Sequence, residues 1–564
     1  MTVLAGERLH GTDGIRGLVS KSQVPNNPIE KLILQREISP SLMQVIGLAT
    51  GTVIISQKSK SGAANQNNPL VVIGWDRRDG NAELVDSLEL GLLQSGCDTQ
   101  RIGEVPTPGL HHCLLLCQAS AGMMVTASHN PATDSGVKLF DENGFKSMPE
   151  LEDTISEIAW AIVEERCDVA SLNDAQKGTT RLIFDGLDAY RRHLKSTLTV
   201  MANALNIPSN SIGDSIGSQG LLLDSSGGAA TDWLGFGLTR RGLMTEEVAD
   251  TEQPINANCG AGEFSSTDSW TFQYLMENEQ SHLLLKKIAE RLRENDGMAP
   301  WDNGELIAAA LDGDGDRCLL IEATKKGARI VDGDQMAFDW LMALKMAGKS
   351  NLKMAHSIES DLCLPAACDN QEIETSQTAI GDRWLSNSLR STIPKTEQLF
   401  IDESMPNICG CEDSGHLVMP SPHPHKSGYW GLAGDGAATL IAQLLARTKL
   451  GEKRQAIDRG WKTRVSIKGV DRTLWDGANE LSHAVEDICS QEFGEGVLSR
   501  VSIEGENSLL LLEGRMNNID ISVGVRNSGT EAKTSVTIRT SDNEYNLSGL
   551  ADKIANILSS NLIV

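Results

Sequence analysis

The sequence predicts an α/β protein of three or four domains. The chain has 564 residues, which is more than one hydrophobic core normally supports. A short apolar run, a glycine-rich turn and a helical pattern follow one another repeatedly up to about residue 450, and this succession is typical of α/β layers. Aromatic residues make up only 4% of the chain, so the predicted sheets must rely on Val, Ile, Leu and Ala.

The charge of the chain limits its partners. Fifty basic and 76 acidic side chains give a formal charge of −26, which repels nucleic acid and anionic lipid surfaces. We therefore expect neither nucleic acid nor membrane as a partner, and any anionic substrate must meet local positive charge. The acidity is also explained by solubility or a salty environment.

The location of the protein follows from what the chain lacks. Met1 to Gly11 has no apolar core of a signal peptide, and no run approaches the roughly 18 apolar residues of a membrane span. Eleven scattered cysteines fit a reducing compartment, so we expect a cytoplasmic protein. The close pairs Cys113/Cys117 and Cys409/Cys411 lack a second matching pair, and we expect buried thiols rather than zinc ligands there.

The predicted elements fall into four units, with boundaries at 1–205, 206–324, 325–450 and 451–564. Short β-prone apolar runs predict strands, and apolar residues three and four apart predict helices. Predicted strands lie at 70–74, 121–125, 221–224, 306–311 and 318–321. Predicted helices lie at about 81–94, 151–163, 187–205, 281–294, 334–346 and 547–562. Residues 57–69 are expected to form a polar loop, 207–219 a linker, and 420–429 a long flexible flap.

The predicted strand Ala121–Val125 leads into Thr-Ala-Ser128-His129-Asn-Pro131, with Lys138 ten residues after the serine. The proline stops the turn, so the strand presents a hydroxyl and an imidazole at the edge of a sheet. A Ser–His pair in a loop is also common as hydrogen-bonded decoration. The other loops must decide between these interpretations.

The predicted strand 306–311 leads into Asp312-Gly-Asp314-Gly-Asp316-Arg317. Three carboxylates at alternate positions, with glycines that let the backbone curl, can all face one hard cation. An EF-hand does not explain the pattern, because Arg317 stands where that loop needs glycine and Ala323 where it needs glutamate. The sequence therefore predicts a divalent metal site.

Three further loops carry polar groups suited to a sugar phosphate. The turn His10-Gly-Thr-Asp-Gly-Ile-Arg16-Gly17 places a guanidinium among free backbone N–H groups. Glu412, Ser414 and His416 alternate on what is predicted to be an extended loop, so they can point one way and grip a polyol. Arg526, Ser528, Gly529, Thr530 and Lys533 predict a socket for a phosphate dianion. Each loop is also compatible with an ordinary solvated turn.

Taken together and in this order, the Ser128, Asp312–Arg317, Glu412–His416 and Arg526–Lys533 motifs resemble the α-D-phosphohexomutase family. The resemblance implies a four-domain architecture around a central cleft, with three related α/β domains of mixed sheets and a smaller C-terminal α+β domain. The four units then become a phosphoserine domain, a metal-binding domain, a sugar-binding domain and a phosphate-binding domain, in that order.

The resemblance also implies a role for each matching residue. Ser128 matches the phosphoserine, and its phosphate with Asp312, Asp314 and Asp316 matches the ligands of one Mg²⁺. His129 and Lys138 match acid–base and phosphoryl-stabilising residues, and Arg16 and Arg317 match cations beside the reaction centre. Glu412, Ser414 and His416 match the sugar-hydroxyl loop. The loop that holds the non-reacting phosphate corresponds to Arg526, Ser528, Gly529 and Thr530.

The chemistry agrees with these roles. A phosphoserine carries about −1.5 to −2 charges at pH 7, so three adjacent aspartates would repel it unless a metal lay between them. The implied reaction moves phosphate between C6 and C1 of a hexose through phospho-Ser128 and a hexose 1,6-bisphosphate. The partner is then a small sugar phosphate, and the chain is expected to be a monomer or homodimer.

The substrate is predicted from smaller motifs. Residues 11–17, 135–140, 331–335 and 381–383 are most similar to the phosphoglucosamine mutase branch, which implies conversion of glucosamine 6-phosphate to glucosamine 1-phosphate for amino-sugar biosynthesis. Phosphomannomutase or phosphoglucomutase activity is the alternative, and a non-catalytic sugar-phosphate-binding protein is the second. Cys411 and Ala532 depart from the glycine and proline usual in the family. A serine hydrolase is disfavoured because Ser128 lacks the Gly-x-Ser-x-Gly elbow.

Overall fold

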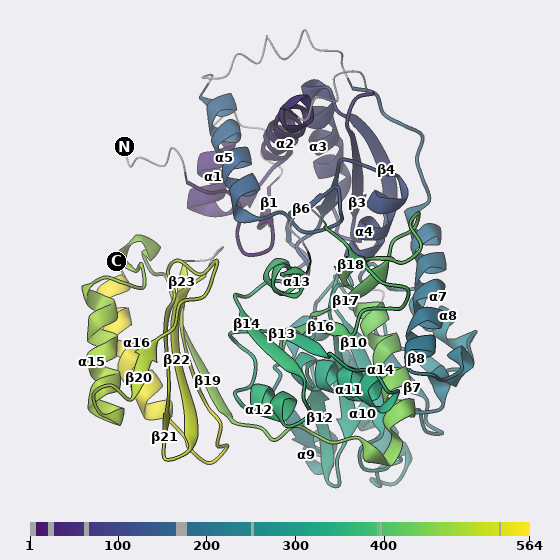
Figure 1. Cartoon of the computed structure of the whole chain (residues 1–564), viewed down its shortest axis with the longest axis vertical. Helices are drawn as coiled ribbons and strands as arrows, with labels where there is room; N and C mark the ends of the chain where they lie inside the picture. The colour runs from purple at the N-terminus through teal and green to yellow at the C-terminus, as the bar shows by residue number, and fades with distance from the viewer. Residues whose placement is uncertain are drawn as a thin grey trace.

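The computed structural model describes residues 7–20, 27–60, 67–164, 178–249, 253–391, 393, 398–528 and 532–563. Within these ranges the chain builds three six-stranded sheets and one five-stranded sheet. In Figure 1 the first sheet, in purple and blue, lies in the upper part of the molecule, the second and third lie below it, and the yellow fourth sheet stands to one side.

The first sheet has the strand order β2-β1-β6-β5-β3-β4 and mixes parallel with antiparallel pairs. Its strands are β1 (Ile15–Val19), β2 (Glu37–Ile38), β3 (Leu70–Trp75), β4 (Asp98–Glu104), β5 (Ala121–Val125) and β6 (Asp134–Asp141). The helices of this part are α1 (Pro28–Gln35), α2 (Pro40–Lys60), α3 (Asn81–Ser95), α4 (Thr107–Leu116) and α5 (Pro149–Val163). All five residues of β5 are buried, as their apolar run predicts.

The second sheet has the order β8-β7-β10-β11-β12-β9, with strands β7 (Leu221–Asp224), β8 (Thr245–Glu247), β9 (Ser269–Thr271), β10 (Leu306–Leu311), β11 (Cys318–Ala323) and β12 (Gly327–Val331). The third has the order β14-β13-β16-β17-β18-β15, with strands β13 (Lys353–Ser357), β14 (Glu374–Thr378), β15 (Phe400–Ile401), β16 (Ile408–Cys411), β17 (Leu417–Pro422) and β18 (Tyr429–Gly434). If the strands of each of these two sheets are numbered from one to six in chain order, both sheets have the spatial order 2-1-4-5-6-3. The predicted relationship between these two units is therefore confirmed at the level of topology.

The helices of this central part of the chain are α7 (Gly186–Ala204), α8 (Leu234–Thr239), α9 (Phe272–Glu277), α10 (Leu283–Glu294), α11 (Gly333–Met346), α12 (Cys363–Asp369), α13 (Asp382–Arg390) and α14 (Gly436–Leu450). Short 3₁₀ turns lie at Ser209–Gly213, Ala261–Glu263 and Gly451–Lys453. Asp332 and Asp435 cap α11 and α14 by accepting backbone N–H hydrogen bonds in the first turn.

The three chemistry-bearing turns occupy one equivalent position. In each of the first three sheets, one strand lies parallel to the strand that is second from an edge, and it is then connected to an antiparallel partner on its other side. The connection after β5 carries Ser128, the one after β10 carries the three aspartates, and the one after β16 carries Glu412 to His416. Each sheet therefore delivers one functional turn from the same place in its topology.

The last part of the chain is an antiparallel sheet with two helices, as the resemblance implies. Its order is β19-β23-β22-β21-β20, with strands β19 (Trp461–Lys468), β20 (Leu498–Arg500), β21 (Leu510–Met516), β22 (Ile519–Asn527) and β23 (Lys533–Thr540). The helices α15 (Glu480–Phe493) and α16 (Ser548–Leu562) lie alongside the sheet, and a 3₁₀ turn spans Arg472–Leu474. They share a hydrophobic core with it that is separate from the other cores.

Packing crosses two of the predicted boundaries. The limit at 324/325 falls inside the β11–β12 hairpin, since β12 pairs with β11 in the second sheet. The second unit therefore extends through Val331. The helix α7, which the sequence places in the first unit, contributes Tyr190, Leu194 and Leu198 to the core shared by the second and third sheets.

The predicted flexible flap at 420–429 is instead a β-hairpin of β17 and β18. The prolines Pro420 and Pro422 lie in β17 and are paired with Leu432 and Trp430 of β18. The turn of the hairpin reaches the first domain, where His425 Nε2 lies 2.8 Å from the carbonyl oxygen of Leu116 at the end of α4. None of the helices in the described part of the chain is long and apolar enough to cross a bilayer.

Two buried histidines make the stability of the fold sensitive to acid. His112 of α4 stacks on His193 of α7 with ring centroids 4.1 Å apart, and His193 Nε2 lies 3.2 Å from Ser421 Oγ of β17. Burial lowers the pKa of each imidazole from 6.5 to about 3, and the His193 ring further lowers that of His112. Below pH 6.5 these two histidines become protonated in the unfolded chain but stay neutral in the folded chain.

We therefore expect the free energy of unfolding to fall as the pH drops from 6.5 towards 3, by about 2 kcal/mol per histidine at pH 5. His193→Gln keeps a polar group near Ser421 but cannot titrate. Thermal unfolding at pH 7 and pH 5 should show a smaller pH-dependent loss in this variant than in the unmodified chain. An equal loss in both proteins would contradict the assignment.

Candidate active site

The turn that carries Ser128 is strained and tightly held. Ser128 has a φ of 54°, in the left-handed region, where a residue with a side chain has a higher conformational energy. Such a conformation persists only where the surrounding structure imposes it. Its N–H donates to Thr126 Oγ1 at 2.8 Å, and its carbonyl accepts from Arg78 Nη2 at 2.5 Å. Its hydroxyl donates to Asp312 Oδ2 at 2.8 Å. The serine thus faces the predicted metal loop.

The aspartate loop forms a buried cluster of three carboxylates. One ligand oxygen from each of Asp312, Asp314 and Asp316 lies within 4.8 Å of the others. Burial, followed by the charges of the other two aspartates, raises the pKa of Asp312 to about 7. Asp314 Oδ1 is buried without a hydrogen-bond partner among the described residues. This surplus of negative charge and free oxygen fits a hard divalent cation.

Lys138 of β6 closes the other side of the cluster. Its Nζ lies 2.7 Å from both Asp314 Oδ2 and Asp316 Oδ2, and 3.2 Å from Asp13 Oδ2. Burial would lower the pKa of this ammonium, but the carboxylates of Asp13, Asp314 and Asp316 raise it well above its ordinary value. Lys138 is therefore a permanent cation beside Ser128, suited to stabilising phosphoryl oxygens.

The remaining predicted reaction-centre residues surround the same point. The positive charge of Arg317, together with burial, holds the pKa of His129 well below its ordinary value, so the imidazole is neutral. The backbone N–H of Arg317 donates to Asp312 Oδ1 at 3.1 Å, and its guanidinium Nε lies 4.0 Å from Asp312 Oδ2. Arg16 donates to the carbonyl of Ala127 at 3.4 Å and pairs with Asp13. The structure thus brings these predicted residues together.

The Glu412–His416 segment is a tight turn rather than the predicted extended loop. The N–H of Gly415, with φ of 86°, donates to the carbonyl of Glu412 at 3.1 Å. His416 Nδ1 lies 3.6 Å from Asp316 Oδ1, and its Nε2 lies 3.3 Å from Asp382 Oδ2. Although burial opposes it, the charges of Asp316 and Asp382 raise the pKa of His416 to about 10. The turn therefore reaches the metal loop directly.

Within the turn, Ser414 Oγ donates to Glu412 Oε2 at 3.3 Å. Glu412 Oε1 also accepts from the N–H of Gly381 at 2.6 Å. The side chains of the turn are therefore held in place by one another and by the loop at the start of α13.

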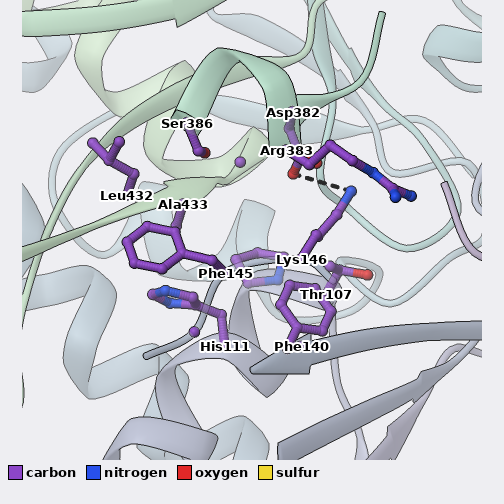
Figure 2. A pocket seen from close by; sticks show the side chains of 13 residues that line it. Thr107, His111, Phe140, Phe145, Lys146, Asp382, Arg383, Ser386, Leu432 and Ala433 are labelled. Carbon is purple, nitrogen blue, oxygen red and sulfur yellow. Dashed lines mark ion pairs between the residues drawn. The ribbon is translucent and has the colours of Figure 1, made fainter. Parts of the chain in front are cut away.

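A small pocket marks the contact between the first and third sheets. Figure 2 shows Lys146 pointing towards Asp382, with Phe140, Phe145 and His111 beside it. The two charged groups lie 3.0 Å apart, and Lys146 Nζ also lies 2.7 Å from Asp13 Oδ1. The pocket encloses about 20 Å³, enough for a water molecule but not for a sugar.

The predicted phosphate socket lies on the fourth sheet. Arg526 of β22 pairs with Glu506 at 2.8 Å, and Glu506 accepts a hydrogen bond from the backbone of Ile380. Ile380 directly precedes Gly381, which binds Glu412, so this loop is linked to the sugar turn. The carbonyl of Ser528 accepts from Arg472 at 3.0 Å. Gly529 and Thr530 lie outside the described residues.

Several site residues do not follow from the motifs alone. Arg78 donates to the carbonyls of Ser128, Asn130, Pro131 and Asp134, and Asn256 donates to the carbonyls of Ser128 and Asn130. Asp13 and Asp382 lie within the motifs 11–17 and 381–383, so the charged residues of these motifs are a sequence signal that could have identified them. Asn256 and Lys146 contact residues more than a hundred positions away, and short-range spacing carries no signal for them.

A buried serine and a carboxylate triad on turns of repeated α/β domains, with a lysine from a neighbouring strand, are suited to a divalent cation and a phosphoryl group. Sequence profiles of phosphoglucomutase/phosphomannomutase match the chain twice, with alpha/beta/alpha domain I at residues 7–166 and alpha/beta/alpha domain III at residues 332–459. Together they cover just over half of the chain. The protein belongs to the α-D-phosphohexomutase family.

Individual relatives agree with this membership. The chain is 29% identical over 498 residues to the phosphoglucosamine mutase of Frankia casuarinae, which covers 86% of this chain and 90% of that one. It is 26% identical over 565 residues to the phosphoglucosamine mutase of Leifsonia xyli subsp. xyli, covering 98% and 99%.

Solved structures share the fold. A phosphoglucomutase/phosphomannomutase family protein from Burkholderia thailandensis matches with a TM-score of 0.61 at 18% identity, over 99% of each chain. Parafusin, a phosphoglucomutase from Paramecium, matches with a TM-score of 0.58 at 15% identity, over 98% of this chain and 96% of that chain.

Proposed function

We propose that the chain interconverts hexosamine 6-phosphate and hexosamine 1-phosphate, with glucosamine as the favoured sugar. The observation that carries the proposal is the 2.8 Å hydrogen bond from Ser128 Oγ to Asp312, with Lys138 bound to the other two aspartates. A serine that is held beside a cation site and a permanent ammonium can carry a phosphoryl group. The relatives named phosphoglucosamine mutase support the choice of a hexosamine.

In the proposed reaction, phospho-Ser128 donates its phosphoryl group to the free hydroxyl of a bound hexosamine monophosphate. The phosphorus–oxygen bond to Ser128 breaks and a new one forms to the sugar oxygen. The proton of the sugar hydroxyl passes to a base, and the Ser128 oxygen takes up a proton to become a hydroxyl again. We assign that base to His129, whose imidazole is neutral, and stabilisation of the negative charge to Lys138 and Arg317. The 1,6-bisphosphate then reorients, and its other phosphate returns to Ser128.

Asp312, Asp314 and Asp316, together with the phosphate on Ser128, would hold one Mg²⁺. The bound cation would neutralise charge that develops on the transferring phosphoryl group. Without such a charge, a phosphoserine beside three carboxylates would be strongly disfavoured. The three aspartates therefore suit a phosphorylated Ser128 only when a cation is shared between them.

We assign recognition of the sugar hydroxyls to Glu412, Ser414 and His416. We assign binding of the non-reacting phosphate to Arg526, Ser528, Gly529 and Thr530. We divide the chain into a phosphoserine domain to residue 205, a metal-binding domain to 331, a sugar-binding domain to 450 and a phosphate-binding domain to 564. A cytoplasmic location and a monomeric or homodimeric state stay predictions.

Intact-mass spectrometry tests the phosphoserine directly. After incubation with glucose 1,6-bisphosphate and Mg²⁺, we expect one phosphate on the unmodified chain and none on Ser128→Ala. A coupled assay with glucosamine, glucose and mannose phosphates at equal concentration should favour glucosamine. The absence of phosphate on Ser128 would refute the mutase, whereas a preference for glucose or mannose would overturn only the assignment of the sugar.

A further inference from the structure

Asn256 joins the serine turn to the second sheet. It lies in the segment between β8 and the 3₁₀ turn Ala261–Glu263, with its side chain buried and a φ of 61°. Its Nδ2 donates to the carbonyl oxygens of Ser128 at 2.8 Å and Asn130 at 3.0 Å. A side chain of one domain thus binds the backbone of the reactive turn of another.

The segment that carries Asn256 is anchored to the end of β7. The N–H of Asn256 donates to the carbonyl of Ser226 at 3.0 Å. Asp224, the last residue of β7, accepts from the N–H groups of Ser226 and Gly260, each at 2.7 Å. Since β7 pairs directly with β10, the position of Asn256 is fixed relative to the strand that leads into the aspartate loop.

The amide of Asn256 also lies against the aspartate loop itself. A Cβ atom on Gly313 would lie 2.8 Å from Asn256 Nδ2 and 2.8 Å from the carbonyl oxygen of Ser128. A Cβ on Gly262, six residues after Asn256, would lie 2.7 Å from His129 Cβ. The serine turn, the aspartate loop and the Asn256 segment therefore meet without space between them.

Arg78 and Asn256 bind the same two carbonyl oxygens, those of Ser128 and Asn130. Arg78 belongs to the domain of Ser128 and also binds Pro131 and Asp134, so it fixes the shape of the turn. Asn256 belongs to the domain of the aspartates. We propose that Asn256 is a positioning residue that sets the place of Ser128 relative to Asp312, an inference that rests on the phosphoserine function proposed above.

The hydrogen-bond pattern of Asn256 separates this role from simple packing. Asn256 Oδ1 is buried without a hydrogen-bond partner among the described residues, so the donor group makes the side-chain contacts to the turn. Aspartate has the same size as asparagine but presents two acceptor oxygens to the two carbonyls. A positioning donor therefore predicts that Asn256→Asp is at least as damaging as Asn256→Ala, whereas a packing role predicts that the isosteric change is the milder one.

The kinetic test compares Asn256→Asp, Asn256→Ala and the control Asn258→Asp, whose side chain is exposed two residues away. With the glucosamine phosphates we expect kcat to fall by about a hundredfold in Asn256→Asp, with KM within about twofold, because misplacement by about 1 Å costs this much. Asn258→Asp should retain the unmodified values. A normal kcat in Asn256→Asp, or a change confined to KM, would overturn the proposal.

Hydrogen exchange gives a readout that does not depend on turnover. We expect the amides of residues 126–134 to exchange faster in Asn256→Asp than in the unmodified chain, and at the unmodified rate in Asn258→Asp. Unchanged exchange in Asn256→Asp would refute the positioning role even in an active enzyme. Faster exchange in a chain that takes no phosphate on Ser128 would leave the positioning contact established and refute the mutase alone.

Discussion

Asp314→Asn is expected to abolish Mg²⁺-dependent turnover while the fold remains. Asparagine keeps the shape of the side chain. Its amide oxygen can still accept the hydrogen bond that Thr107 Oγ1 donates to Asp314 Oδ2 at 2.5 Å. The change removes one negative charge from the cluster that would hold the cation. We expect turnover to fall by about a thousandfold or more, since such stabilisation is worth several kcal/mol and about 4 kcal/mol corresponds to a thousandfold.

The measurement is the rate of mutase turnover against Mg²⁺ concentration, together with a thermal unfolding curve. Asp302→Asn removes the same charge from an exposed position near the start of β10 and serves as the control. It should retain both rate and stability. Full activity of Asp314→Asn in the presence of a chelator would show that the aspartate cluster holds no catalytic cation.

Arg526→Ala should weaken binding of the substrate far more than it slows the chemistry. A charge-assisted contact to phosphate is worth about 1.5–3 kcal/mol, so KM should rise by about tenfold to a hundredfold while kcat changes little. Steady-state kinetics with the preferred sugar phosphate measure both constants. A normal KM would place the phosphate socket elsewhere.

Substitution of Glu506, the carboxylate that pairs with Arg526, is expected to change KM in the opposite direction. Glu506 Oε1 lies 2.8 Å from the Arg526 guanidinium, so an incoming phosphate must compete with this carboxylate. Glu506→Gln removes the competing charge and should lower KM, while the exposed neighbour change Glu504→Gln should not. A raised KM in Glu506→Gln would mean that the carboxylate orients Arg526 rather than competing for it.

Local patterns predicted several strands and the convergence of the three aspartates. The runs Ala121–Val125, Leu221–Asp224 and Leu306–Leu311 are strands with the predicted limits, because each is a short apolar run followed by polar or glycine-containing turns. The three aspartates converge as their alternation with glycine predicts. In these cases the information lies within a few residues, where backbone freedom and burial decide the outcome.

Other features depend on partners that are distant in the chain. Prolines suggested a flap at 420–429, yet Pro420 and Pro422 are accommodated in strand β17, opposite β18. Alternating polar residues suggested an extended loop at Glu412–His416, but the antiparallel pairing of β16 with β17 requires a tight turn. Asn256 could not be found at all, because its contacts to Ser128 and Asn130 span more than a hundred residues.

The equivalent placement of the three turns bears on how the specificity of this protein can be altered. Each turn joins two strands that are already paired within a complete six-stranded sheet, so the residues at its tip contribute little to the sheet that carries it. In the proposed reaction, sugar recognition resides on the third sheet, and phosphoryl transfer on the first two. Redesign within residues 412–414 is therefore a route to a new sugar, whereas His416 must be kept because its Nδ1 lies 3.6 Å from Asp316 Oδ1.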